Sequence, residues 1–230
     1  MADKKKRNKI KIGSFVTPIG TARYPHLNAP DTKWVEEGEY RCPLIYSEDV
    51  ANSLRPKLAA FLDKGFEDLK REHFSDAPNS AKARRLAKSP LPLKALEDEE
   101  GNGTGEYLLN LKKRASGTKK DGTPWKAKIN IVDSKGRKLL PAPSIWGGSK
   151  LRVDADVFAF YFPKDNTVGL TFEIMGVQVV ELVSGSGERE STFGEVEGGY
   201  VGEEAGEDFG RGGEDPDAAH DDDNAGAADF

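Results

Sequence analysis

The chain has 230 residues and a formal net charge of −5, and this charge is distributed unevenly. Residues 184–230 carry 15 acidic and 2 basic residues, a net of −13, so residues 1–183 carry a net of +8. The single cysteine, Cys42, excludes an internal disulfide framework and a Cys-based zinc site, and the three separated histidines indicate neither a metal cage nor a catalytic triad. The longest apolar run, residues 157–162, is far shorter than the ~20 residues that span a bilayer, and the start has no signal-peptide form. We therefore expect a soluble protein of a reducing compartment, with no membrane span and no cofactor, that is not an enzyme.

The chain begins with a short basic arm, residues 3–9, which is either a solvated terminus or an accessory phosphate contact. Residues 10–46 then show short alternating stretches broken by turns that contain Pro and Gly. This pattern is typical of extended segments, so we expect short strands before the first helix.

One segment has a clear helical pattern. Apolar residues recur at three- and four-residue spacing over residues 47–74, which predicts a helix with a single apolar stripe. Ser47 is placed to cap this helix, and Pro56 is expected to kink it or to split it. The following residues, 75–105, are irregular, with room for a short helix at 79–88.

The second half of the chain predicts an antiparallel β unit. Apolar and polar residues alternate over residues 107–114 and again over 125–131, and the connection between them contains an Asp-Gly hairpin signal. Two longer strand patterns follow at residues 151–162 and 168–183. Short antiparallel strands with one added helix favour an all-β fold of the OB type, which is a five-stranded antiparallel barrel.

The composition changes abruptly after Val183. Eleven of the 25 glycines fall in residues 184–230, together with the acidic excess. Such a segment cannot bury enough apolar surface to offset the entropy lost on ordering. The sequence therefore predicts one OB-fold domain over residues 1–183 and a disordered acidic tail over residues 184–230.

Basic residues are concentrated in residues 106–152, which hold 12 Lys and Arg against 3 Asp and Glu. Alternation places Lys112 and Arg114 on one face of their strand, and Lys126 and Lys128 on one face of the next. If these two strands pair, the four cations form one patch that attracts a polyanion and releases counterions on binding. The alternative is an ordinary solvated lysine face.

Aromatic rings strengthen the expectation of a nucleic-acid surface. Aspartates mark the polar face of the strand pattern at 151–162, and alternation places Phe158, Phe160 and Phe162 on that same face. Rings in this position are either covered by another element or are platforms on which bases stack for ~1–3 kcal/mol each. Further candidate rings are Trp34, Tyr40, Tyr46 and Trp125.

The acidic tail ends in Asp229-Phe230, an aromatic residue with a free carboxylate. The tail can occupy the basic surface of the body, and its terminal ring can fill a pocket on a partner protein. The alternative is a solubilising tail with a chance last residue.

Enzyme motifs are missing, because the glycine-rich stretch 101–105 lacks the Lys-Ser/Thr and the helix of a phosphate-binding loop.

Four stretches together carry a likeness to a known family. They are residues 132–138 (Val-Asp-Ser-Lys-Gly-Arg-Lys), residues 145–153 (Ile-Trp-Gly-Gly-Ser-Lys-Leu-Arg-Val), the run 177–183, and the Asp-Phe terminus. They resemble the single-stranded DNA-binding proteins of phage replisomes, of the kind found in short-tailed coliphages. This resemblance implies an OB-fold with an added helix, sequence-independent binding of single strands, and roles in DNA replication, recombination and repair in the host cytoplasm.

The resemblance also implies partners and contact residues. It implies a homodimer and an acidic tail that contacts the replicative DNA polymerase and the helicase-primase. Lys112 and Phe160 fall where the family has DNA-contacting basic and aromatic side chains. Two departures concern the stacking arrangement, because Arg114 stands where an aromatic residue is expected and Phe160 replaces an expected tyrosine.

We therefore expect a protein that coats, protects and anneals single-stranded DNA without reading its sequence. The expected DNA contacts are Lys112, Arg114, Trp125, Lys126, Lys128, Lys150, Arg152 and Phe160. The expected partner contacts are Asp229 and Phe230. Two other classes remain open at this point: an RNA-binding OB-fold protein or RNA chaperone, and an adaptor whose basic face binds an acidic protein.

Overall fold

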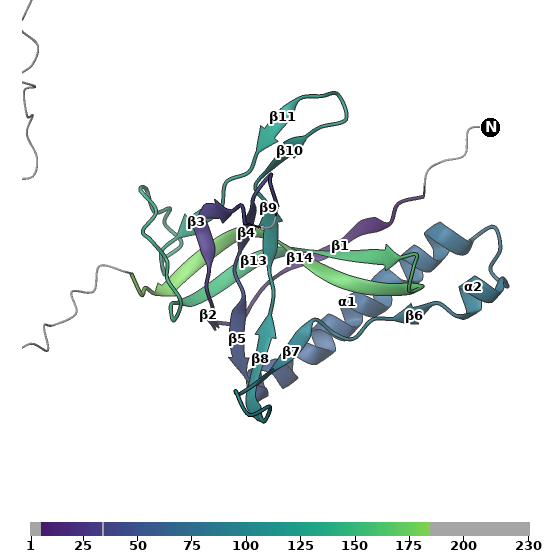
Figure 1. The fold of residues 1–230 in the computed structure, drawn as a ribbon, viewed down its shortest axis with the longest axis horizontal. Coiled ribbons are helices and arrows are strands. Elements are labelled where there is room, and N and C mark those ends of the chain that lie inside the picture. Colours follow the sequence, from purple (N-terminus) through teal and green to yellow (C-terminus); the bar gives the residue numbers. More distant parts are fainter. Residues whose placement is uncertain (1–5, 34, 185–230) are drawn as a thin grey trace, which may run out of the picture. The chain divides into compact units, whose positions relative to one another are not determined.

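The computed structural model describes residues 6–33 and 35–184, and Figure 1 shows their arrangement. The chain divides into two units after Gly187, so the described residues all belong to the first unit, and the expected tail lies outside them except for Ser184. The helices are α1 (Glu48–Phe74) and α2 (Ala81–Arg84). The strands are β1 (Lys9–Val16), β2 (Gly20–Ala22), β3 (His26–Asp31), β4 (Glu39–Arg41), β5 (Leu44–Ser47), β6 (Ala87–Lys88), β7 (Leu93–Glu97), β8 (Gly103–Leu109), β9 (Lys112–Arg114), β10 (Ser116–Thr118), β11 (Pro124–Lys126), β12 (Asn130–Val132), β13 (Lys150–Phe162) and β14 (Thr167–Glu181).

The described strands form one large curled sheet and one small hairpin. The large sheet has twelve strands in the order β3-β4-β9-β14-β13-β2-β5-β8-β7, with β1 beside β13 and with β6 and β12 beside β14. The antiparallel pair β13 and β14 is its centre, and β5 and β8 cross the direction of this pair (Figure 1). The expected β-rich fold with one main helix is confirmed.

This sheet differs in detail from the expected five-stranded antiparallel barrel. It contains more strands, and β6, β9 and β12 run parallel to β14. Hairpin signals predict only antiparallel neighbours, whereas parallel neighbours need long connections. The strands β6 and β9 reach β14 from far earlier in the chain, so no local pattern could place them there.

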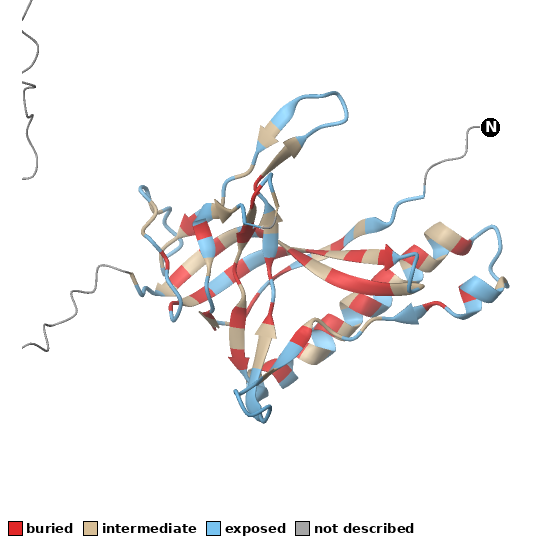
Figure 2. Ribbon diagram, viewed as in Figure 1, coloured by how far each residue is buried: buried red, intermediate tan, exposed pale blue. Residues whose placement is uncertain are grey.

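The alternation predicted for the central strand is confirmed. Along β13, residues Val153 to Tyr161 alternate between buried odd positions and less buried even positions (Figure 2). The buried residues of this strand are Leu151, Val153, Ala155, Val157, Ala159 and Tyr161. One face of the strand therefore belongs to the core, and the other face is available to solvent or to a ligand.

Helix α1 covers the buried face of the central strands. Its buried stripe includes Leu54, Leu58, Leu62 and Leu69, as its spacing predicts. The helix contacts β13, β14 and β1, and it runs without a break through Pro56, so the expected split is wrong. Leucines on both sides of this proline are buried against the sheet, and this packing holds the two halves in one helix. The helix begins directly after Ser47, although the Ser47 side chain makes no capping hydrogen bond.

The predicted hairpin exists, but its strands pair differently from the expectation. The Asp-Gly turn joins β10 to β11, with Ser116 opposite Lys126 and Gly117 opposite Trp125. The strand β9 instead pairs with β4 and β14. The small hairpin projects from the large sheet next to β9 (Figure 1). The expected pairing of residues 107–114 with 125–131 is therefore wrong.

The lone cysteine is a core residue. Cys42 lies between β4 and β5 with no exposed surface, and burial raises the pKa of its thiol to about 12. A thiol in this environment stays protonated and inert at neutral pH.

Among the described residues, no helix combines the length and the apolar character that crossing a membrane requires.

Candidate nucleic-acid interface

Three phenylalanines project from the outward face of β13, and we call them the ring face. Phe158 and Phe160 are half-buried, and Phe162 is 44% exposed. The rings of Phe160 and Phe162 meet edge to face with centroids 4.1 Å apart. The rings belong to the accessible side of the sheet, opposite the residues that α1 covers.

Close packing holds Phe160 in place without hiding it. Its ring lies across Gly169 on β14, where an added Cβ would come within 2.7 Å of the ring edge. The absence of a side chain at Gly169 therefore lets the ring lie against the backbone. Next to it, the Nζ of Lys9 lies 4.2 Å from the centroid of Phe158, a cation–π contact.

A pocket of about 410 Å³ adjoins the ring face, and we call it the basic pocket. It unites three of the predicted site residues, Lys112, Arg114 and Trp125, although they come from different sheets. Its lining residues are Lys9, Glu39, Lys112, Lys113, Arg114, Trp125, Thr171, Phe172 and Glu173. Thr171 also stands opposite Phe158 in the β13–β14 ladder, so the basic pocket and the ring face are continuous.

Trp125 reaches the basic pocket because of a glycine opposite it. The indole lies against Gly117, where an added Cβ would be 3.0–3.1 Å from the ring atoms. The indole is only half-buried, so one part of it remains available for stacking. A small residue at position 117 thus fixes the ring while leaving it accessible.

Carboxylates already hold several cations of this surface. Glu39 accepts from Lys112 at 3.0 Å and from Arg41 at 3.2 Å. Lys11 pairs with Asp156 at 2.6 Å, and Lys9 lies 4.0 Å from Glu173. The three lysines are each more than half exposed, and ion pairs open to solvent are worth only ~0–1 kcal/mol, so a phosphate can displace the carboxylates. The cations are thereby oriented before any polyanion arrives.

The remaining predicted cations lie elsewhere. Lys126 and Lys128 are exposed, but alternation turns Lys126 to the side of β11 opposite Trp125. The single patch expected from Lys112, Arg114, Lys126 and Lys128 is therefore wrong, because β11 pairs with β10 and not with β9.

Lys150 and Arg152 mark the other end of β13. Ten residues separate Lys150 from Phe160, which corresponds to about 33 Å of extended strand. The Lys150 Nζ donates to Thr21 Oγ1 at 2.7 Å, and Arg152 donates to the carbonyl of Thr17 at 3.4 Å. These two residues therefore do not line the basic pocket.

The remaining candidate rings and the partner contacts do not lie on this surface or fall outside the described residues. Tyr40 and Tyr46 are core residues, 8% and 3% exposed, so neither offers a stacking surface. Trp34, Asp229 and Phe230 lie outside the described residues. The sequence analysis included Lys9 only as part of the basic arm, residues 3–9, and it did not single out Lys113. Alternation with Ile10 and Ile12 marks Lys9 and Lys11 as one face of a strand.

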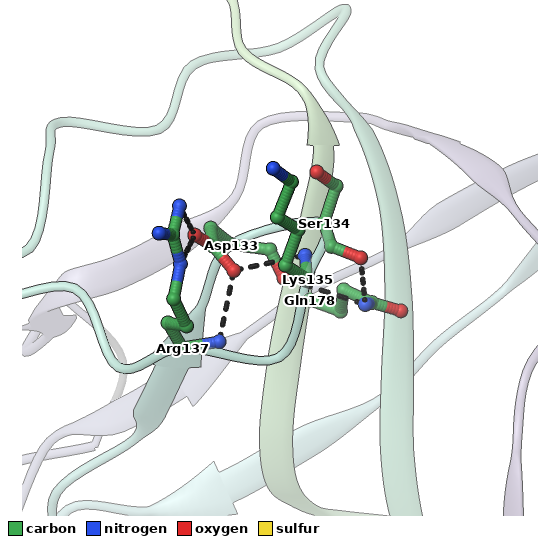
Figure 3. A network of polar contacts seen from close by, with 5 residues as sticks. All are labelled: Asp133, Ser134, Lys135, Arg137 and Gln178. Atoms are coloured by element: carbon green, nitrogen blue, oxygen red, sulfur yellow. Dashed lines mark hydrogen bonds and ion pairs between the residues drawn. The ribbon is translucent and has the colours of Figure 1, made fainter.

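The stretch 133–137, one of those that carry the family likeness, forms a closed turn (Figure 3). The Asp133 carboxylate accepts from the backbone N–H groups of Lys135 and Arg137 and from the Arg137 guanidinium, at 2.8–2.9 Å. These bonds, chiefly that from the Arg137 backbone, lower the pKa of Asp133. Gln178 on β14 donates to the carbonyls of Asp133 and Ser134 at 3.3 and 3.0 Å. The turn is thus fixed to β14 and presents its basic side chains to solvent.

Within residues 6–33 and 35–184, no cluster of His, Cys, Asp and Glu is arranged to hold a metal ion. The geometry instead combines cations, accessible rings and an open pocket on one face of a sheet. Such a surface can hold a flexible polyanion that carries flat bases.

Comparison with known proteins agrees with this geometry. The single-stranded DNA-binding proteins of Enterobacteria phage T3 and Escherichia phage T7 are each 28% identical to this chain, over 201 and 196 residues. These matches cover 83% and 81% of this chain and 86% and 84% of the relatives.

Solved structures share the fold. The crystal structure of gp2.5, a single-stranded DNA-binding protein encoded by bacteriophage T7, matches with a TM-score of 0.58 at 23% identity, covering 82% of this chain and 98% of that one. The C-terminally truncated single-stranded DNA-binding protein of bacteriophage Enc34 matches with a TM-score of 0.51 at 14% identity, covering 80% and 94%. The family model described as "Single-stranded DNA-binding protein, Bacteriophage T7" matches residues 19–182. The chain therefore belongs to the bacteriophage T7 family of single-stranded DNA-binding proteins.

Proposed function

We propose that this protein binds single-stranded DNA without sequence preference, through the ring face and the basic pocket. The observation that carries the proposal is the continuity of the two sites, with Phe158 opposite Thr171 and Lys9 shared between them. The relatives named as single-stranded DNA-binding proteins support the same conclusion.

The geometry suggests how binding proceeds. Backbone phosphates replace the carboxylates of Glu39 and Glu173 as partners of Lys112 and Lys9, and counterions leave the DNA. Unpaired bases then stack on the flat faces of Phe160 and Trp125, and stacking of this kind tolerates any base because every base has a π-face. A duplex cannot offer its bases in this way, since its bases already stack on each other.

The experiment that tests this proposal removes one ring. Phe160→Ala should weaken binding of a short oligo-dT by ~1–3 kcal/mol, or roughly 5- to 150-fold in Kd, because one base loses its platform. Fluorescence anisotropy at fixed salt measures this effect, and a thermal melt checks the fold.

Tyr107→Ala is the matched control. Tyr107 on β8 is also half-buried and has the Arg55 guanidinium 5.0 Å from its centroid, but it lies away from the ring face. This variant should bind DNA as the unaltered chain does. Equal affinities for both variants, or a collapse of the Phe160→Ala fold, would contradict the role of the ring face.

Competition between DNA and RNA of the same sequence separates the proposal from an RNA-binding function, which would show a preference that depends on the 2′-hydroxyl.

We extend the proposal to the biological roles that the family likeness implies. The protein coats, protects and anneals single strands in phage DNA replication, recombination and repair, acts stoichiometrically rather than as an enzyme, and works as a homodimer in the host cytoplasm. The acidic tail, ending in Asp229 and Phe230, recruits the replicative polymerase and the helicase-primase. We also propose that the core of the sheet is a variant of the OB fold.

A further inference from the structure

Two aromatic rings stand exposed at the β3 edge of the sheet, outside the surfaces described above. Tyr24 is 77% exposed and Trp146 is 55% exposed. Both line an open pocket of about 380 Å³, which we call the edge pocket, together with residues that include His26 and Asn28. The volume lies within the ~300–1,000 Å³ range of pockets that take small molecules.

The edge pocket is built from two segments that are tied together by hydrogen bonds. The Asn28 side chain donates to the carbonyls of Ala142 and Pro143, at 3.3 and 2.7 Å, and accepts from the Ile145 N–H at 3.3 Å. The N–H of Gly148 donates to the Ala22 carbonyl at 2.9 Å. The rings therefore stand on a preorganised backbone although more than a hundred residues separate them in the chain.

The backbone at Tyr24 is held in a conformation that large residues seldom adopt. Its φ is +47°, in the left-handed region, which costs of order 1–3 kcal/mol for a residue other than glycine. The Trp146 N–H donates to the Val183 carbonyl at 3.0 Å, which anchors the other ring. Strain of this kind persists only where the surrounding structure fixes it, and here it holds a ring toward solvent.

The edge pocket is connected to the basic pocket by a row of aligned residues. In the strand register, His26 on β3 stands opposite Arg41 on β4, and Arg41 stands opposite Lys112 on β9. Two strand spacings, about 10 Å, therefore separate His26 in the edge pocket from Lys112 in the basic pocket. The row continues from Lys112 to Glu173 on β14, which also lines the basic pocket. One line of residues across four neighbouring strands therefore leads from the edge pocket to the basic pocket.

The chemistry of the edge pocket favours a nucleobase over an apolar protein segment. The Arg23 guanidinium lies 5.9 Å from the Tyr24 ring centroid, where it can meet a phosphate next to a stacked base. None of the residues that line the edge pocket is acidic, unlike the basic pocket with its Glu39 and Glu173. Flat rings with an arginine beside them and no carboxylate in the lining match a polyanion that carries flat heterocycles.

We propose that Tyr24 and Trp146 form a second base-stacking site, which receives an unpaired base of the same strand that crosses the basic pocket. This inference rests on the proposed function and extends it, because it lengthens the path of the single strand across β14, β9, β4 and β3. Short oligonucleotides use the ring face and the basic pocket alone, and longer ones engage the edge pocket as well.

The test compares variants over a series of oligo-dT lengths. Tyr24→Ala and Trp146→Ala should leave the Kd of the shortest oligonucleotides unchanged and raise that of long ones at least fivefold, since one stacking contact is lost. Trp146→Phe should restore most of the affinity, because it keeps a flat ring. Leu140→Ala is the matched control, since Leu140 is 76% exposed but does not line the edge pocket, and it should bind at every length as the unaltered chain does.

The outcomes separate this inference from the function itself. If Phe160→Ala weakens binding while Tyr24→Ala and Trp146→Ala bind long oligonucleotides normally, the second stacking site is wrong and the proposed function stands. If none of the three variants affects binding, both fail. If Trp146→Ala shifts the oligomeric state in sedimentation at unchanged affinity, the edge pocket is an interface between copies of the chain, and the inference is overturned.

Discussion

Glu39 holds two cations at once, Lys112 in the basic pocket and Arg41 on its own strand, β4. One carboxylate oxygen accepts from Lys112 and the other from Arg41, which itself also pairs with Asp31 at 3.2 Å. The Glu39 side chain is only 15% exposed, so it is the best shielded member of this group of charges along with Asp31. A DNA phosphate that approaches Lys112 must therefore compete with a fixed negative charge that the protein supplies.

Removing that charge should strengthen DNA binding. We expect Glu39→Gln to lower the Kd for oligo-dT roughly two- to fivefold, since an ion pair of ~0.5–1 kcal/mol, in which only the lysine is well exposed, no longer has to be replaced. Anisotropy titrations at several salt concentrations measure the effect. Glu106→Gln on β8 changes the net charge equally and is the control. If both variants tighten binding to the same degree, only net charge matters and Glu39 has no special role.

At the scale of elements, the contact between α1 and β13 sets how closely the helix can approach the sheet. Gly65 faces Ala159 on the buried side of β13, and a Cβ at position 65 would clash with the Ala159 Cβ. The helix thus contains a residue that weakens its intrinsic stability and in return allows close packing. Because β13 carries the ring face on its other side, this contact also supports the position of Phe160.

Gly65→Ala should destabilise the protein. Overpacking costs ~1–3 kcal/mol, while the gain in helix propensity is about 1 kcal/mol, so the net change favours unfolding. Urea unfolding followed by circular dichroism measures the free energy of unfolding. Ala60→Gly, at an exposed position of the same helix, calibrates the propensity effect alone, near 1 kcal/mol. An increase in stability for Gly65→Ala would show that the helix can move away from the sheet at little cost.

For the whole molecule, we expect the separation of charge between body and tail to govern access to the DNA surface. Residues 184–230 carry a net charge of −13, and the rest of the chain carries a net charge of +8. Opposite charges in one chain attract at low salt, and screening weakens this attraction as salt rises. We therefore expect the tail to compete with DNA for the same cations.

Deleting residues 184–230 should tighten binding to single-stranded DNA and flatten its dependence on salt, because the competing polyanion is gone. Titrations of the full chain and of the shortened chain across a range of salt concentrations test this. A chain that keeps the tail length but carries Asn and Gln in place of its Asp and Glu separates charge from bulk. Identical affinities at all salt concentrations would remove the idea that the tail restrains binding.

The sequence by itself determined the features that follow from the periods of helix and strand, although it predicted a kink or a break at Pro56 and the helix runs on without a break. The spacing of apolar residues predicted α1, and alternation assigned Phe158, Phe160 and Phe162 to the face of β13 that carries the aspartates. The Asp-Gly signal placed the hairpin turn correctly. These features follow from the fixed periods of helix and strand, so a single local segment contains the information.

Only the tertiary structure decided which strands become neighbours. It placed β9 beside β14 and β11 beside β10, which brought Trp125 to Lys112 and Arg114 but turned Lys126 away. It also brought Tyr24 to Trp146 across more than a hundred residues of the chain. Alternation defines the two faces of a strand but not the strand that lies next to it, because pairing depends on contacts between residues remote in sequence. The cations and the rings could thus be read from the sequence, whereas the surface they share is a property of the folded sheet.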